Sequence, residues 1–180
     1  YMIVSVSRRT DIPAFYSEWF FNRIKENYFM VRNPMNIHQI SKVSLDASVI
    51  DCIVFWTKNP RPLMKKLYIL NKKYGPDSYY FQYTLNGYDK DLEKNVESLD
   101  KRISTFKELA KMIGKEKVVW RYDPIVLTDK YDIAFHERMF DYLLKELTPY
   151  TCRCVISFVD LYDKTERNMA GIKLRKLTNE

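Results

Sequence analysis

The stretch Lys117–Thr128, KVVWRYDPIVLT, decides the fold. Its apolar run Val118–Trp120 is typical of a strand that is buried on both faces, as in a parallel sheet. Because a proline cannot donate to a strand ladder and restricts the residue before it, Pro124 predicts that the strand ends near Asp123. Arg121 and Asp123 are two residues apart, so their side chains share a face. An arginine and an aspartate therefore stand at the carboxyl end of an internal strand, where α/β proteins build their sites.

Four other apolar runs of strand length are followed by polar residues in the same way. Because the carboxyl ends of parallel strands lie at the same edge of a sheet, we expect these polar residues to gather there. The runs are Met2–Val6, Cys52–Phe55, Tyr79–Tyr83 and Arg153–Phe158. The polar residues at their ends include Arg8, Arg9, Asp11, Trp56, Thr57, Lys58, Gln82, Thr84, Ser157 and Asp160.

Between these runs, apolar residues recur at helical spacing. The spacing predicts helices over residues 15–28, 62–74, 98–113 and 133–147. Ser17 and Asp132 are candidate N-caps, and Gly75 and Gly114 are candidate helix stops. Residues 86–95 are polar and predict a loop, whereas the alternation over residues 28–45 predicts a small β excursion. With 180 residues and no evident linker, residues 1–180 are expected to form a single domain.

Strands that alternate with helices predict a parallel sheet with crossover helices. Two architectures fit this pattern: an open doubly wound sheet, and part of a (β/α) barrel. A doubly wound sheet concentrates its site at one switch point, whereas here every strand ends in polar groups. We therefore favour an α/β fold with an incomplete parallel, TIM-like (β/α) barrel of about five strand–helix units.

Five strands leave the edges of such a barrel unpaired. The sequence therefore predicts either self-association through open sheet edges, or that residues 1–180 are the N-terminal part of a longer barrel protein.

The net charge of +7, from 30 basic and 23 acidic residues, favours anionic partners. Since the basic residues are dispersed along predicted helix faces, we expect an anionic small molecule rather than nucleic acid as the partner. No apolar run approaches the roughly 20 residues that a membrane span needs. The chain opens on a strand rather than on a signal segment, and three sparse cysteines suit a reducing compartment, so the expected location is the cytoplasm.

Two candidate groups follow the first and second strands. Arg8 and Arg9 suit bidentate capture of a phosphate or carboxylate, with Asp11 orienting one of them; the alternative is a surface loop with an internal salt bridge. Lys58 suits a fixed positive charge for an anionic substrate. It also suits a Schiff-base nucleophile, and a plain exposed lysine is the third interpretation.

The Arg121–Asp123 pair is the third candidate group, and its alternative is a purely structural ion pair. We predict catalytic roles for Asp11, Lys58, Arg121 and Asp123. The predicted substrate-binding residues are Arg8, Arg9, Trp56, Gln82, Ser157 and Asp160.

The sequence predicts no metal site. The two histidines, His38 and His136, are far apart, and His136 falls in an amphipathic helix where a surface or packing role dominates. Cys152 and Cys154 do not have a zinc or cluster spacing by themselves, and Cys52 lies on another strand.

Six stretches of the chain resemble, in the same order, an uncharacterised prokaryotic family catalogued as domain of unknown function 1848. They are IVSVSRRTDIPAFY, VRNP, DCIVFWTKNP, YYFQYTLNGY, VVWRYDPIVLTDKY and CVISFVDLY. Members of this family usually continue into a cysteine-rich tail with the spacing C-x3-C-x2-C, similar to the cluster-binding motif of radical S-adenosylmethionine enzymes. The resemblance implies a radical-SAM-like partial barrel and, in a full-length protein, an iron–sulfur cluster and S-adenosylmethionine. The 180 residues stop before such a tail, so the sequence predicts no cofactor in this chain.

The sequence is compatible with three functions. The first is an enzyme of the partial-barrel type whose site, at the carboxyl ends of the strands, binds an anionic small molecule or a nucleotide-like substrate. The second is a cofactor-free lyase or isomerase that depends on Lys58. The third is a non-catalytic basic module that binds nucleic acid.

Overall fold

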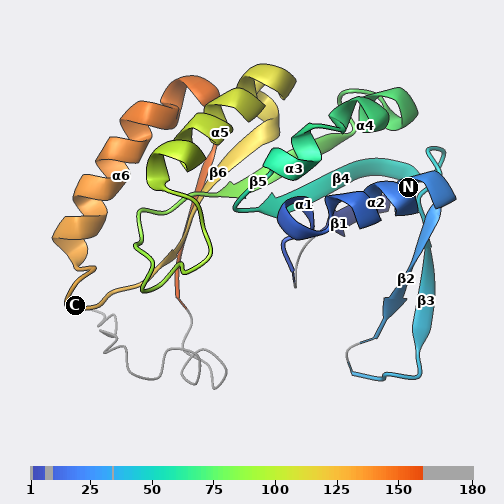
Figure 1. Ribbon diagram of the computed structural model, residues 1–180, viewed down its shortest axis with the longest axis horizontal. Helices are drawn as coiled ribbons and strands as arrows, with labels where there is room; N and C mark the ends of the chain where they lie inside the picture. The colour runs from blue at the N-terminus through green and yellow to red at the C-terminus, as the bar shows by residue number, and fades with distance from the viewer. Residues whose placement is uncertain (1, 7–9, 34, 160–180) are drawn as a thin grey trace.

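The computed structural model describes residues 2–6, 10–33 and 35–159. Five strands form one parallel sheet, and its spatial order follows the chain without a reversal in the described part (Figure 1). The strands, in spatial order, are β1 (Met2–Val6), β4 (Ile50–Thr57), β5 (Tyr79–Thr84), β6 (Val118–Ile125) and β7 (Cys154–Phe158). The prediction of an α/β fold with a parallel sheet is confirmed.

Helices connect the strands and pack on one face of the sheet, as the arch of α3 to α6 along one side of Figure 1 shows. The helices are α1 (Ile12–Phe15), α2 (Ser17–Glu26), α3 (Arg61–Met64), α4 (Leu67–Tyr74), α5 (Leu99–Ile113) and α6 (Ile133–Leu147), and two short 3-10 turns cover Lys115–Lys117 and Thr148–Tyr150. Of the helices in the described residues, none combines the length and the apolar character that a membrane crossing requires.

The hydrophobic core lies between these helices and the sheet. Alternate residues of four strands point into it, because side chains alternate across a strand. They are Val4, Val6, Ile53, Phe55, Tyr79, Phe81, Tyr83, Val118, Trp120 and Tyr122. Aromatic rings meet across the strands, for example Phe55 and Phe81 with centroids 4.9 Å apart. This packing defines one face of the sheet as the helix face.

The opposite face of the sheet carries the other alternating set, and we call it the open face. Its residues follow from the strand register, which pairs Ser5 with Val54, Trp56 with Gln82, Thr84 with Arg121 and Arg121 with Val155. The polar candidates Trp56, Gln82, Arg121, Asp123 and Ser157 therefore belong to this face by alternation.

The β excursion predicted over residues 28–45 is confirmed. Strands β2 (Tyr28–Arg32) and β3 (Ile40–Ser44) form an antiparallel hairpin that projects away from the main sheet (Figure 1). Met30 and Ile40 on this hairpin are exposed.

Two of the four predicted helices differ from the structure. The helix predicted over residues 15–28 is the shorter α2, and Tyr16, with φ −131° and ψ 27°, separates it from α1, which was not predicted. Ser17 is the first residue of α2 and not its N-cap, so that prediction was wrong. The helix predicted over residues 62–74 is α3 plus α4, because Lys66 leaves helical geometry.

The two longer predicted helices are confirmed. Asp132 caps α6 by accepting a 2.7 Å hydrogen bond from the backbone N–H of Phe135. Gly114 ends α5 at a φ of 97°, a conformation that suits glycine.

The prediction that the strand after Lys117 ends near Asp123 was wrong. Strand β6 continues through Pro124 to Ile125, and the Asp123–Pro124 peptide bond is cis. The β6–β7 register shifts between Tyr122 and Ile125, so the proline falls at an irregularity of the ladder, where its missing N–H is tolerated. As a result, Asp123 lies within β6 rather than at its last residue.

Candidate functional site

A row of polar side chains crosses the open face. The indole Nε1 of Trp56 donates a 3.1 Å hydrogen bond to Ser5 Oγ on β1. On the other side, the Arg121 guanidinium carbon lies 4.4 Å from the centre of the Trp56 ring. Arg121 forms an ion pair with Asp123, which also accepts a hydrogen bond from the Ser157 hydroxyl on β7. With Gln82 on β5, these residues form what we call the polar row: Ser5, Trp56, Gln82, Arg121, Asp123 and Ser157.

The strand register explains why Arg121 reaches Trp56. Trp56 is level with Gln82, and Gln82 is level with Val119, so Arg121 is two residues nearer the carboxyl end of β6 than Trp56 is on β4. The arginine side chain therefore extends back over β5 to stack on the indole. A guanidinium over a Trp face is a favourable cation–π arrangement.

Arg121 is mostly withdrawn from water. Its side chain is 16% exposed and that of Asp123 is 18% exposed. Burial lowers the pKa of Arg121 from its usual value, because desolvation disfavours the charged guanidinium. The Nε atom of Arg121 is buried and has no hydrogen-bond acceptor among the described residues. A hydrogen-bond donor is thus left unused inside the polar row.

Asn86 fixes the backbone of Asp123. Its side-chain nitrogen donates to the carbonyl oxygen of Asp123 at 3.0 Å, and its side-chain oxygen accepts from the backbone N–H of Asp123 at 3.0 Å. Asn86 is 1% exposed. The polypeptide after Asn86 also lies tightly against α6, because a Cβ at Gly87 would come within 2.4 Å of the Met139 side chain.

A second group of charges, the charged cluster, lies at the end of β4. The Asp11 carboxylate accepts 2.7 Å hydrogen bonds from Thr57 Oγ1 and from the backbone N–H of Lys58. The Lys58 ammonium forms an ion pair with Glu93, and the other Glu93 oxygen is 3.0 Å from Arg102 Nη1. Glu93 and Arg102 are both buried, so the loop between β5 and α5 is bound to the end of β4 through charges.

The structure divides the predicted site residues into three sets. Trp56, Gln82, Arg121, Asp123 and Ser157 come together on the open face, whereas Asp11 and Lys58 belong to the charged cluster. Arg8, Arg9 and Asp160 lie outside the described residues.

Ser5 of the polar row, Glu93 and Arg102 of the charged cluster, and Asn86, which holds the backbone of Asp123, were not predicted as site residues from the sequence. Ser5 lies inside an apolar run. Alternation along that run would have placed its side chain on the same face of the sheet as the other open-face residues. Asn86 and Glu93 lie in a loop that was predicted as polar and without a role. Arg102 lies in α5, four residues before Phe106 and seven before Leu109, so the helical spacing that predicts the apolar stripe also places Arg102 on the buried face; this signal was overlooked.

The cysteines do not form a ligand set for an iron–sulfur cluster. All three lie in the described part, where no group of three or more His, Cys, Asp or Glu side chains could hold a metal ion. Burial raises the pKa of the Cys52 thiol above its ordinary value. It raises the pKa of the Cys154 thiol to about 11, and both shifts disfavour the thiolate needed for ligation. Cysteines 52, 152 and 154 therefore do not fit such a cofactor.

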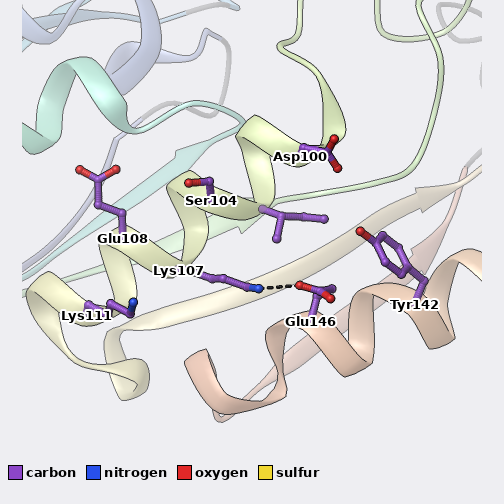
Figure 2. Close-up of a pocket in the computed structure, with 8 residues that line it drawn as sticks. Asp100, Ser104, Lys107, Glu108, Lys111, Tyr142 and Glu146 are labelled. Atoms are coloured by element: carbon purple, nitrogen blue, oxygen red, sulfur yellow. Dashed lines mark hydrogen bonds and ion pairs between the residues drawn. The ribbon is translucent and has the colours of Figure 1, made fainter.

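A groove lies between α5 and α6 and is lined by side chains of both helices (Figure 2). Because these helices pack on the helix face, the groove is separated from the polar row by the sheet. Lys107 and Glu146 form a 2.5 Å ion pair across it. Lys111 and Glu108 also line the groove, so charges of both signs are mixed along it. Such pairing is typical of a solvated contact between neighbouring helices.

These observations define the protein as an α/β protein whose parallel sheet carries helices on one face and a polar row on the other. The family model described as Domain of unknown function (DUF1848) matches residues 3–180, and the chain belongs to that family. No curated protein and no solved structure gives a significant match.

Proposed function

We propose that this domain is part of an enzyme that binds an anionic small molecule, or the phosphate of a nucleotide-like substrate, on its open face. The polar row would hold the ligand. Arg121 would donate hydrogen bonds to the anion, and Trp56 would support the guanidinium. Asp123, assisted by Ser157, would transfer a proton or orient a donor group.

The unpaired Nε–H of Arg121 is the observation that carries this proposal. A buried donor without an acceptor costs about 1–3 kcal/mol. A phosphate or carboxylate oxygen would remove that cost, and charge-assisted hydrogen bonds to a guanidinium are among the strongest in proteins. Asp123 pairs with one terminal nitrogen of the Arg121 guanidinium, so the remaining N–H groups of that guanidinium can donate to a ligand.

The proposal includes the incomplete (β/α) barrel. Sequential parallel strands with helices on one face are the arrangement of a barrel wall, whose other face would be the interior. In barrel enzymes the reacting groups lie at the carboxyl ends of the strands. Asp123 lies in the carboxyl half of β6, and Arg121 lies just before the middle of that strand.

Radical chemistry at an iron–sulfur cluster remains part of the proposal only for a longer protein, since the cysteines of this chain do not fit a cluster. A lysine-dependent lyase receives less support. The Lys58 side chain is already engaged in an ion pair with the buried Glu93 carboxylate, so it is not free to act as a nucleophile.

Isothermal titration calorimetry with pyrophosphate and with adenosine monophosphate tests the proposal. We expect the Arg121→Met variant to bind at least about tenfold more weakly than the unmodified chain, because it loses the charge-assisted bonds. The matched control is Lys111→Met, which removes one positive charge from the exposed α5–α6 groove and is expected to change the affinity less than twofold.

Equal weakening by both substitutions would mean that the anions bind through diffuse charge, and would contradict the proposed site. Binding of neither probe by the unmodified chain would also contradict it. A DNA or RNA oligonucleotide that binds with a steep salt dependence, insensitive to Arg121→Met, would favour the nucleic-acid alternative.

A further inference from the structure

Tyr122 stands between Arg121 and Asp123 on β6, and its side chain points to the helix face. Its hydroxyl is 2.8 Å from Nδ1 of His136 on α6, and Nε2 of His136 is 3.1 Å from the carbonyl oxygen of Val126. Because a carbonyl oxygen only accepts, Nε2 carries the hydrogen, and Nδ1 accepts from the Tyr122 hydroxyl. One neutral imidazole thus connects β6 to the segment that follows it.

Tyr88, from the loop after β5, forms hydrogen bonds with the backbone of residues 124–126. Its hydroxyl donates to the carbonyl oxygen of Pro124 at 2.7 Å and accepts from the backbone N–H of Val126 at 2.8 Å. Tyr88 and His136 are buried, and their rings meet edge-on with centroids 5.9 Å apart. All the polar atoms of these two side chains are therefore used to hold residues 122–126.

We propose that Tyr88 and His136 are positioning residues that, through Tyr122, Pro124 and Val126, hold Asp123 and Arg121 in place over Trp56. We call Tyr88, Tyr122 and His136 the latch. This inference deepens the proposed function and rests on it for the role of the polar row. None of the three latch side chains lies on the open face; the latch acts from behind the sheet.

The geometry explains why hydrogen bonds behind the sheet reach the open face. Pro124 follows Asp123 directly, and Val126 comes right after the last residue of β6. Because the β6–β7 register is irregular between Tyr122 and Ile125, the ladder fixes this stretch less completely than the rest of β6. Side-chain hydrogen bonds supply the missing restraint. A shift of this backbone moves Asp123 and, through the ion pair, the guanidinium that stacks on Trp56.

Nuclear magnetic resonance of the Trp56 indole N–H group tests the latch without any ligand. The variants Tyr122→Phe, Tyr88→Phe and His136→Phe each remove latch hydrogen bonds while keeping an aromatic ring. We expect each to shift the Trp56 indole resonance, which is assigned by its loss in Trp56→Phe, and to leave the Trp19 indole resonance on α2 in place.

The matched control is Tyr79→Phe. It removes a 2.7 Å hydrogen bond to Asn71 from a buried tyrosine on the helix face, near the amino-terminal end of β5. We expect this control to leave the Trp56 resonance unchanged. His136→Gln, which can still donate to the Val126 carbonyl oxygen, should move the Trp56 resonance less than His136→Phe does.

Calorimetry with pyrophosphate then relates the latch to binding. We expect Tyr122→Phe and Tyr88→Phe to weaken binding about fivefold, and Tyr79→Phe to have no effect. Latch variants that move the Trp56 resonance no more than Tyr79→Phe would overturn the inference. If the resonance moves as expected but pyrophosphate does not bind the unmodified chain, the latch stands and the proposed function fails.

Discussion

The guanidinium of Arg121 lies 4.4 Å from the centre of the Trp56 ring, although their strands, β6 and β4, are separated by β5. The arginine crosses an entire strand and ends against an indole that is itself bonded to Ser5 on β1. Side chains from the two ends of the sheet are thereby linked across its open face. The polar row therefore presents hydrogen-bond donors, hydrogen-bond acceptors and one carboxylate to a ligand on the open face.

Replacing Trp56 by leucine should affect binding more than folding. The substitution removes the cation–π contact with Arg121, worth about 0.5–2 kcal/mol, and the hydrogen bond to Ser5. We expect about a tenfold loss of pyrophosphate affinity by calorimetry. Trp19→Leu, at a half-exposed tryptophan on α2, is the control and should leave the affinity unchanged; equal losses in both variants would argue against a role for the stack.

Replacing Asn86 by alanine should destabilise the protein strongly. The side chain is 1% exposed, and its removal leaves the N–H and the C=O of Asp123 without their partner. We expect the free energy of unfolding, measured with urea, to fall by about 2–4 kcal/mol. The exposed Asn22 on α2 provides the control, since Asn22→Ala should change the value by less than about 0.5 kcal/mol. A loss below about 1 kcal/mol for Asn86→Ala would mean that this part of β6 does not depend on the amide.

Glu93→Gln tests the charged cluster. The carboxylate is buried between Lys58 and Arg102, so the amide would leave Arg102 as an uncompensated buried charge. We expect a loss of about 3–5 kcal/mol in the free energy of unfolding. Glu108 has a partner in Arg61, and both are considerably exposed, so Glu108→Gln should cost less than about 1 kcal/mol. Similar losses in the two variants would show that the cluster behaves as a surface ion pair.

The stability of the protein should depend on pH through His136. Burial lowers the pKa of His136 below its ordinary value of 6.5, so below about pH 6.5 the unfolded chain binds a proton that the folded chain resists. The free energy of unfolding should therefore decrease as the pH falls from 7 towards 5, and it should be free of this penalty above pH 7. His136→Gln should flatten this part of the profile in urea titrations at several pH values. An unchanged slope in the variant would assign the pH dependence to other groups.

The fold was largely predictable, because it depends on local patterns. The five strands and the helices α5 and α6 follow from apolar runs and stripes, and Asp132 and Gly114 set helix ends through their own chemistry. The breaks at Tyr16 and Lys66 were not predicted, since neither residue carries a turn signal. The continuation of β6 past Pro124 was missed because the register irregularity that accommodates it is a property of the β6–β7 pair.

The site was predictable only where alternation determines it. Arg121 and Asp123 were expected to share a face, and they form an ion pair there. Trp56 and Gln82 lie on the same face, and the β4–β5 register places Trp56 level with Gln82. The partners of Lys58 and the buried hydrogen bonds of His136 and Tyr88 come from contacts between distant segments. No periodicity in one segment can indicate such contacts.

Chemical-shift mapping of the labelled chain during a titration with pyrophosphate tests the central claim most directly. We expect saturable shifts of the Trp56 indole N–H, the Gln82 side-chain amide and the Arg121 Nε–H, while the Trp19 indole signal stays in place. Shifts confined to the α5–α6 groove around Lys107 and Lys111, with the Trp56 and Arg121 signals unmoved, would contradict it.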